Sequence, residues 1–268
     1  MIRLSRAVRC SVNDAPSAGV AQAGPPVNGY AAHPPMQGLG RHYELVLECW
    51  GEVDPLTGYF LSISEIDRAA RTAVLPLLED ACRSAPQTEP TRLLPALVRA
   101  ASAALEGRLH SLTWRLSPTY SVRMETQQMD RAIIRQSFEF AASHVLHSPS
   151  LSPEQNRALF GKCNNPSGHG HNYRIEPAVA VPAGSSAFGL PDLERITDEV
   201  IIRRLDHTHL NRDVPEFAGD ALNPSVENIS KVCFDLLRPA VAAASGGAAA
   251  LLSVTVWETE KTSCVYPG

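Results

Sequence analysis

The chain has 268 residues, which exceeds the commonest domain size and leaves room for one large domain or two small ones. Hydrophobic residues make up 44% of it, charged residues 19%, and the formal net charge is −4; this is the composition of a globular protein and argues against a nucleic-acid partner. No apolar run is long enough to span a membrane, so no membrane partner is expected.

The cysteines and the N-terminal residues predict the compartment. The six cysteines are scattered without a Cys-x-x-Cys pair, which suits a reducing cytoplasm better than a disulfide framework. Residues 1–7 contain no continuous apolar segment, so a secretory signal is not expected. We therefore expect a cytoplasmic protein.

In the first half of the chain, the apolar pattern predicts two strands, two helices and two further strands. The helices are expected near 64–80 and 91–105, where apolar residues recur at helical spacing. A long loop that contains Pro, Gly and Ser follows the first strand, at 13–40.

The second half repeats this order. One strand is expected at 134–144, and a loop at 145–168 separates it from the next strand. The apolar face of that next strand comprises Tyr173, Ile175, Val179 and Val181. Helices are expected near 192–205 and 225–237, followed by two strands.

The first half resembles a degraded copy of the second. Residues 38–43 parallel residues 168–173, and both halves have the same expected order of elements. We therefore expect two domains, at 1–128 and 129–268.

Three histidines of the second half predict a metal site. His169 and His171 are two residues apart on a strand, so both side chains point to one face and can bind one ion. His144 projects from the apolar face of the preceding strand and would add a third imidazole. Three neutral histidines with one open position are the usual ligand set of catalytic zinc. Cys163 as a fourth ligand would instead give a closed structural site, and the spacing alone leaves both alternatives open.

The first half lacks these ligands. Leu39 and Arg41 stand where the second half has its histidine pair. A leucine offers no lone pair and an arginine repels a dication. We therefore expect 1–128 to be a structural repeat without zinc or catalytic residues, and 129–268 to be the zinc-binding catalytic repeat.

Five segments of the second half, in one order, resemble the family of 6-pyruvoyl-tetrahydropterin synthase and 6-carboxy-tetrahydropterin synthase. They are FEFAASH (138–144), GKCNNPSGHGHNY (161–173), LDHTHLN (205–211), NPSVEN (223–228) and WET (257–259). The resemblance implies an α+β, tandem T-fold: two ββααββ units, each with an antiparallel four-stranded sheet backed by a helix pair. Such units join into an oligomeric barrel, which removes the open sheet edges. Three tandem chains would form a homo-oligomeric pseudo-hexamer.

The resemblance also implies a cofactor and the groups that move protons. A Zn²⁺ ion would be bound by His144, His169 and His171. Cys163 would be the base that removes a proton from a substrate carbon, and the Asp206-His207 pair would be the second proton-transfer group. His209 is expected to be a surface or loop-packing residue.

Contacts to the substrate are implied as well. Glu258 and Thr259 would hold the pterin ring, although an ion pair with Lys261 is an alternative for the glutamate. Glu227 would also contact the substrate; its alternative is a first-turn carboxylate of a helix that Ser225 caps. The triphosphate would be bound by some of the basic residues Arg131, Arg135, Arg157, Lys162 and Arg174.

The implied reaction is a lyase reaction of tetrahydrobiopterin biosynthesis. It converts 7,8-dihydroneopterin triphosphate to 6-pyruvoyl-tetrahydropterin and triphosphate. The first alternative is the 6-carboxy-tetrahydropterin synthase reaction of the queuosine and deazaguanine pathway, which takes the same substrate and releases acetaldehyde and triphosphate. The second alternative is a non-catalytic, zinc-stabilised pterin-binding or scaffold protein.

Overall fold

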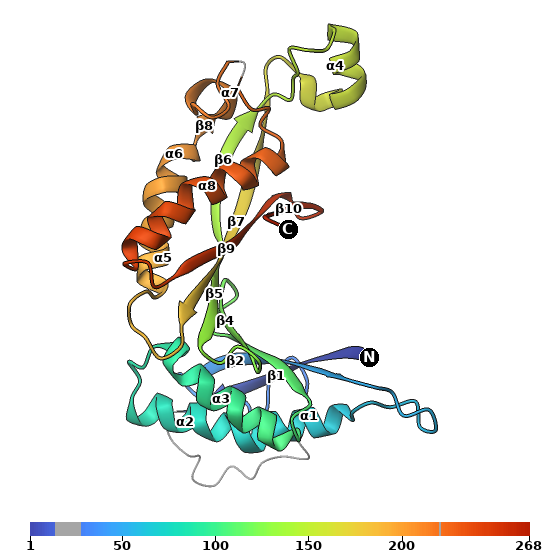
Figure 1. The fold of residues 1–268 in the computed structure, drawn as a ribbon, viewed down its shortest axis with the longest axis vertical. Coiled ribbons are helices and arrows are strands. Elements are labelled where there is room, and N and C mark those ends of the chain that lie inside the picture. The colour runs from blue at the N-terminus through green and yellow to red at the C-terminus, as the bar shows by residue number, and fades with distance from the viewer. Residues whose placement is uncertain (14–27, 220) are drawn as a thin grey trace. The chain divides into compact units, whose positions relative to one another are not determined.

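The computed structural model describes residues 1–13, 28–219 and 221–268, and Figure 1 shows its elements. Residues 14–27 of the predicted loop at 13–40 lie outside the described residues. The chain divides into two units: the first comprises Met1–Ile134 and Val181–Ser186, and the second Arg135–Ala180 and Ala187–Gly268. Among the helices of the described residues, none has the length and apolar character that crossing a bilayer requires.

The first unit contains an antiparallel sheet in the order β1-β2-β3-β4. Its strands are β1 (Ile2–Val12), β2 (Arg41–Gly51), β3 (Leu109–Arg115) and β4 (Tyr120–Glu125). Alternate residues of these strands are buried, as in Val8, Cys10 and Val12 of β1. The apolar face of this sheet therefore forms one side of the unit's core.

Helices cover that face of the first sheet (Figure 1). They are α1 (Ile63–Ala69), a π-helical turn η1 (Ala70–Val74), α2 (Leu75–Ser84) and α3 (Pro90–Ala104). The Ser62 hydroxyl caps α1 by accepting from the N–H of Ser64, and Pro90 begins α3, where the missing N–H costs nothing. The two predicted helical regions are confirmed.

In the second unit, β6 (Phe138–His144) pairs antiparallel with β7 (His169–Pro182), and β7 pairs antiparallel with β9 (Ala250–Thr259). The hairpin partner of β9 is β10 (Thr262–Tyr266). A short strand, β8 (Thr208–His209), pairs with β6 in the parallel direction. The sheet is therefore mixed, and the expectation of a purely antiparallel sheet is wrong for this unit.

The predicted helices of the second unit are confirmed. The first consists of α5 (Leu190–Thr197), η3 (Asp198–Ile202) and α6 (Arg203–Leu205), and the second is α8 (Val226–Ala244), which packs on β9 and β10. A four-residue helix, α7 (Leu210–Asp213), follows β8.

The predicted loop at 145–168 contains a helix that the apolar pattern does not reveal. This helix is α4 (Pro153–Phe160), and a 3₁₀ turn, η2 (Gly161–Asn164), follows it. Ser152 and Gln155 form a capping box at its start, which is a signal that the sequence does contain.

The single strand predicted at 134–144 is interrupted at Ser137 and forms β5 (Arg131–Gln136) and β6. The Ser137 carbonyl accepts from Nε2 of Gln136 at 2.9 Å, and its hydroxyl donates to Glu176 at 2.9 Å. Side-chain hydrogen bonds thus take the place of strand pairing at this residue.

Candidate metal centre and active site

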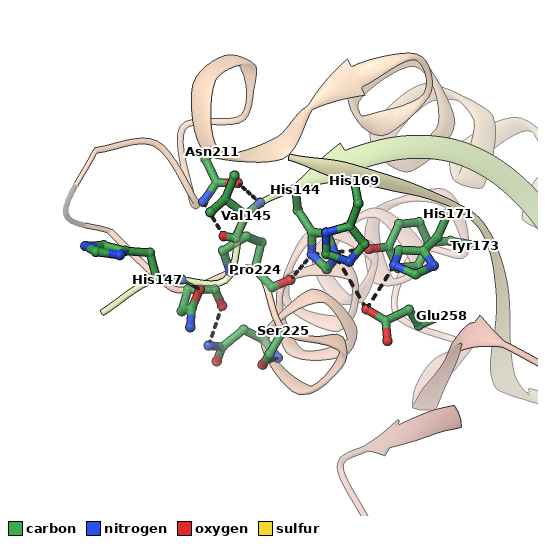
Figure 2. Close-up of polar contacts among 12 residues, drawn as sticks. His144, Val145, His147, His169, His171, Tyr173, Asn211, Pro224, Ser225 and Glu258 are labelled. Atoms are coloured by element: carbon green, nitrogen blue, oxygen red, sulfur yellow. Dashed lines mark hydrogen bonds and ion pairs between the residues drawn. The ribbon is translucent and has the colours of Figure 1, made fainter. Parts of the chain in front are cut away.

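Three histidines converge at one end of the β6–β7 pair. His144 ends β6 and lies opposite His169, the first residue of β7, while His171 lies opposite Ala142. The Nε2 atoms of His144 and His169 are 3.1 Å apart. One ligand atom from each of the three histidines lies within 4.8 Å of the others, and Figure 2 shows the rings together. The structure therefore brings together the three residues that the sequence predicts as metal ligands.

The ring nitrogens of this cluster fit a metal ion. His144 is completely buried, and its Nδ1 lies 2.7 Å from the carbonyl of Pro224. A neutral ring that donates from Nδ1 presents the lone pair of Nε2 to the other histidines. Within the described residues, Nε2 of His171 is buried without a hydrogen-bond partner, an arrangement that costs about 1 to 3 kcal/mol. A cation would remove that cost, and three neutral imidazoles match zinc.

Burial keeps the imidazoles of His144 and His171 unprotonated. It lowers the pKa of His144 to about 4, although the hydrogen bond to Pro224 opposes the change. Burial also lowers the pKa of His171, against the opposing charge of Glu258. Because metals bind the unprotonated ring, both side chains are ready to act as ligands at neutral pH.

The metal-free protein should lose stability as the pH falls from about 6.5 to about 4. In this window His144 is protonated in the unfolded chain, where its pKa is 6.5, but not in the folded chain, where its pKa is about 4. The unfolded state binds more protons, so the free energy of unfolding falls, by an amount on the order of 3 kcal/mol from this residue. Urea unfolding with a chelator present measures the effect. In a His144→Asn variant the free energy of unfolding should depend less on pH over this range. The same pH dependence in the variant and the wild type would contradict the lowered pKa of His144.

Asparagine side chains hold the segment that follows His144 (Figure 2). Asn211 accepts from the N–H of Val145 at 2.8 Å and donates to its carbonyl at 3.0 Å. Oδ1 of Asn223 accepts from the N–H of His147 at 3.2 Å. The segment has left the strand, so side-chain amides replace its missing backbone partners. These contacts fix the chain directly after the metal ligand His144.

Replacing Asn223 with alanine should weaken zinc binding about tenfold, at the lower end of the range for losing an outer-shell partner. The side chain of Asn223 accepts from the N–H of His147. The next residue, Pro224, orients His144 through its carbonyl. Competition with a chromophoric chelator measures the affinity. Asn223→Asp keeps the acceptor oxygen and should restore binding. The control is Asn156→Ala, which removes a buried amide that holds the same loop farther along, at Ser148. Equal losses of zinc affinity in Asn156→Ala and Asn223→Ala would indicate general loosening of the loop.

Cys163 lies outside the group of converging ligand atoms. Among the described residues, the ligand atoms that converge within 4.8 Å of one another are one from each of the three histidines, and Cys163 contributes none. Cys163 is half-buried in η2, and its carbonyl accepts from the N–H of Leu146 at 2.9 Å. Burial raises the pKa of the Tyr173 phenol, and the nearby side chains of Glu258 and Cys163 add to the change. The geometry thus favours a thiol near the metal site over a fourth zinc ligand.

Asp206 and His207 form a hydrogen-bonded pair at the edge of β6. Oδ2 of Asp206 lies 2.8 Å from Nδ1 of His207, and Oδ1 accepts from the N–H of Ala141 at 2.8 Å. The hydrogen bonds from Ala141 and His207 hold the pKa of Asp206 below its ordinary value. The carboxylate is therefore ionised and orients a ring that is 83% exposed. In the described part of the chain, no hydrogen bond or ion pair joins this pair to the three histidines.

Glu258 points toward the histidine cluster. Its Oε1 lies 3.5 Å from Nε2 of His144 and 3.7 Å from Nε2 of His171, and its side chain is 20% exposed. Figure 2 shows the carboxylate below the rings. Among the described residues, the basic side chains within 4 Å of its carboxylate are these histidines and not Lys261.

The other two predicted substrate residues lie on the surface. Thr259 is exposed, and its hydroxyl accepts from the N–H of Lys261 at 3.2 Å in the turn between β9 and β10. Glu227 is exposed in the first turn of α8, where Ser225 caps the helix by accepting from the N–H of Asn228. The Ser225 hydroxyl lowers the pKa of Glu227. These contacts are those of the first-turn carboxylate that the sequence leaves as an alternative.

A hollow of about 660 Å³ lies beside the β6–β8 edge. Its lining includes both His171 of the cluster and His207 of the proposed proton-transfer pair. His209 lines it too, and both of its ring nitrogens are buried without a hydrogen-bond partner among the described residues. The sequence predicts His209 to be a surface or loop-packing residue, not a residue of the site. The sequence feature that could have placed His209 in the site is its spacing of two residues from His207, which is also the spacing of His169 and His171.

The second half of the chain matches known proteins. Residues 133–268 match the family model described as 6-pyruvoyl tetrahydropterin synthase. The chain is 39% identical to human 6-pyruvoyl tetrahydrobiopterin synthase over 141 residues, which cover 52% of this chain and 92% of the human protein. It is 36% identical to the Drosophila melanogaster protein of the same name over 145 residues, which cover 53% of this chain and 82% of that protein.

A solved structure gives a further match. The Caenorhabditis elegans 6-pyruvoyl tetrahydropterin synthase is 30% identical, with a TM-score of 0.45, and the match covers 52% of this chain and 96% of that one. The family model spans half of the chain, and the curated relatives are matched over most of their length. The chain therefore belongs to the 6-pyruvoyl tetrahydropterin synthase family.

Proposed function

We propose that this protein is a zinc-dependent lyase that converts 7,8-dihydroneopterin triphosphate to 6-pyruvoyl-tetrahydropterin and triphosphate. The observation that carries the proposal is the convergence of three histidines with a carboxylate beside them. Membership of the 6-pyruvoyl tetrahydropterin synthase family supports the choice of a pterin substrate.

His144, His169 and His171 would hold a zinc ion, which would supply Lewis acidity toward side-chain oxygens of the substrate and so make the adjoining C–H bonds more acidic. Cys163, as a thiolate, removes a proton from a substrate carbon. His207 transfers a second proton through Nε2, because its Nδ1 is engaged with Asp206.

Glu258 is the residue that we propose to hold the pterin ring, with Thr259 and Glu227 as further substrate contacts. A pterin has two adjacent N–H donors, and a carboxylate accepts both in one plane. Arg174 is one candidate for the triphosphate, although its guanidinium lies 4.0 Å from the centre of the Trp257 ring. Arg131 and Arg157 already form ion pairs with Asp130 and Glu154, respectively.

The region 1–128 is, in this proposal, a structural repeat, and three chains supply the six units of a barrel. Leu39 is 96% exposed and Arg41 begins β2, and neither a leucine nor an arginine side chain offers a metal ligand. Within the described part of this region, no three metal-ligating side chains converge. The apolar face of its sheet is covered by its own helices. In the proposed barrel, such a unit would contribute the edges of its sheet for pairing with neighbouring units.

Incubating the zinc-loaded protein with dihydroneopterin triphosphate and identifying the organic product tests the function. Release of triphosphate together with 6-pyruvoyl-tetrahydropterin is the expected result. Acetaldehyde would instead identify the 6-carboxy-tetrahydropterin synthase reaction. Absence of turnover by protein that retains zinc and binds a pterin would favour a scaffold or binding protein.

A further inference from the structure

The carboxylate of Glu258 approaches the histidine cluster from a third strand. Glu258 lies near the end of β9, which pairs with β7 so that Trp257 is opposite Arg174. Its Oε1 comes within 3.5 Å of Nε2 of His144 and 3.7 Å of Nε2 of His171, as the dashed lines in Figure 2 show. The oxygen is therefore directed at the same ring nitrogens that would bind the metal.

These distances are those of atoms that share one ion. Two ligands that are each about 2.0 to 2.1 Å from a tetrahedral zinc ion are about 3.3 to 3.4 Å apart. The nitrogens of His144 and His169 are 3.1 Å apart, and Oε1 of Glu258 is 3.5 and 3.7 Å from His144 and His171. The carboxylate oxygen thus lies at ligand-sharing distance from two of the three histidines.

The surroundings of Glu258 also call for a cation. Its side chain is 20% exposed, and among the described residues the basic side chains within 4 Å of its carboxylate are His144 and His171, with neither an arginine nor a lysine. The Tyr173 ring, which is completely buried, lies beside the same histidines. A carboxylate in such a place is costly unless a positive charge balances it, and a zinc ion would supply that charge.

We propose that Glu258 is the fourth zinc ligand of the substrate-free protein, and that a bound pterin draws the carboxylate away and opens this position. The inference rests on the proposed function, because it requires a pterin substrate. A carboxylate that accepts from two adjacent N–H groups uses both oxygens, so Glu258 serves either the ion or the ring. Pterin binding and the fourth zinc bond are therefore coupled, and by linkage each weakens the other by the same factor.

A Glu258→Gln variant tests the first part. Its zinc affinity, measured by competition with a chromophoric chelator, should fall at least tenfold. The visible spectrum of the cobalt-substituted variant should also differ from that of the wild type, because it depends on ligand number and geometry. Glu260→Gln removes the same charge two residues farther along, at an exposed position, and should leave affinity and spectrum unchanged. A Glu258→Gln protein with wild-type affinity and spectrum would overturn the proposal.

A titration of the unmodified protein tests the second part and does not depend on how the variant folds. Neopterin, which lacks the triphosphate leaving group, is added to the cobalt-substituted protein, and its binding is followed separately by pterin fluorescence. The spectrum should shift toward that of Glu258→Gln. An unchanged spectrum at saturating neopterin, or an absence of neopterin binding, would overturn the release step.

Neither readout measures turnover, so the two proposals fail separately. Both spectral changes without any conversion of dihydroneopterin triphosphate would reject the proposed reaction and leave the role of Glu258 in place. If the protein converts the substrate but its cobalt spectrum changes neither in Glu258→Gln nor on addition of neopterin, the role of Glu258 is rejected and the proposed reaction is retained.

Discussion

Replacing His144 with alanine should leave a protein that retains no zinc after dialysis and has no measurable lyase activity. His144 is completely buried, and its Nε2 lies 3.1 Å from that of His169. Loss of an outer-shell partner alone lowers metal affinity 10- to 100-fold, so loss of a direct ligand should cost at least 100-fold. Metal content by elemental analysis and affinity by chelator competition measure the effect.

The matched control for this variant is His147→Ala. His147 lies three residues farther along, is exposed, and has its Nδ1 3.3 Å from the side-chain amide of Asn164. It should keep wild-type zinc content and activity. Circular dichroism of His144→Ala and of the metal-free wild type separates loss of the ligand from loss of the fold. One zinc ion per chain in folded His144→Ala would mean that the ion is bound elsewhere.

The metal-binding face could be predicted because strands impose strict alternation. In β6 and β7, the parity that buries Phe140 and Tyr173 also places His144 and His171 on the same face. The register that sets His144 opposite His169 could not be derived from the sequence. It depends on how residues 145–168 fold, and that segment contains a helix that the apolar pattern does not reveal.

Contacts between distant segments account for most of what the sequence could not supply. The carbonyl of Pro224 meets His144 across 80 positions of the chain, and β9 brings Glu258 to the same histidines. Local patterns describe each segment but carry no information about which segments meet. The parallel strand β8 was missed for a related reason: two residues are too few to show alternation.

The role of Cys163 illustrates the same limit. Its position before the histidine pair makes it either a fourth ligand or a separate thiol, and spacing cannot decide between them. The structure leaves it outside the converging group, while Glu258 approaches two of the three histidines. A carboxylate that comes from another strand thus takes the place that the sequence offered to a cysteine.

Replacing Cys163 with alanine should lower kcat for dihydroneopterin triphosphate by about 10²- to 10⁴-fold, the usual contribution of a positioned general base. Zinc affinity should stay within about twofold of the wild-type value, because the sulfur is not among the converging ligand atoms. Steady-state kinetics at saturating substrate give kcat, and chelator competition on the same preparation gives the affinity. A fall in kcat at constant affinity separates proton transfer from metal binding.

Cys264→Ala is the matched control for Cys163→Ala. Cys264 is also a free, half-buried cysteine, but it lies on β10 with its Sγ 3.8 Å from the carbonyl of Val265. Its replacement should change neither kcat nor zinc affinity. An effect that both variants share would therefore come from the loss of a cysteine in general and not from the position of Cys163. If Cys163→Ala instead lost zinc as readily as His144→Ala, the cysteine would be a ligand. The site would then be closed in the resting protein without Glu258, and both the catalytic role of the thiol and the release of the glutamate would have to be abandoned.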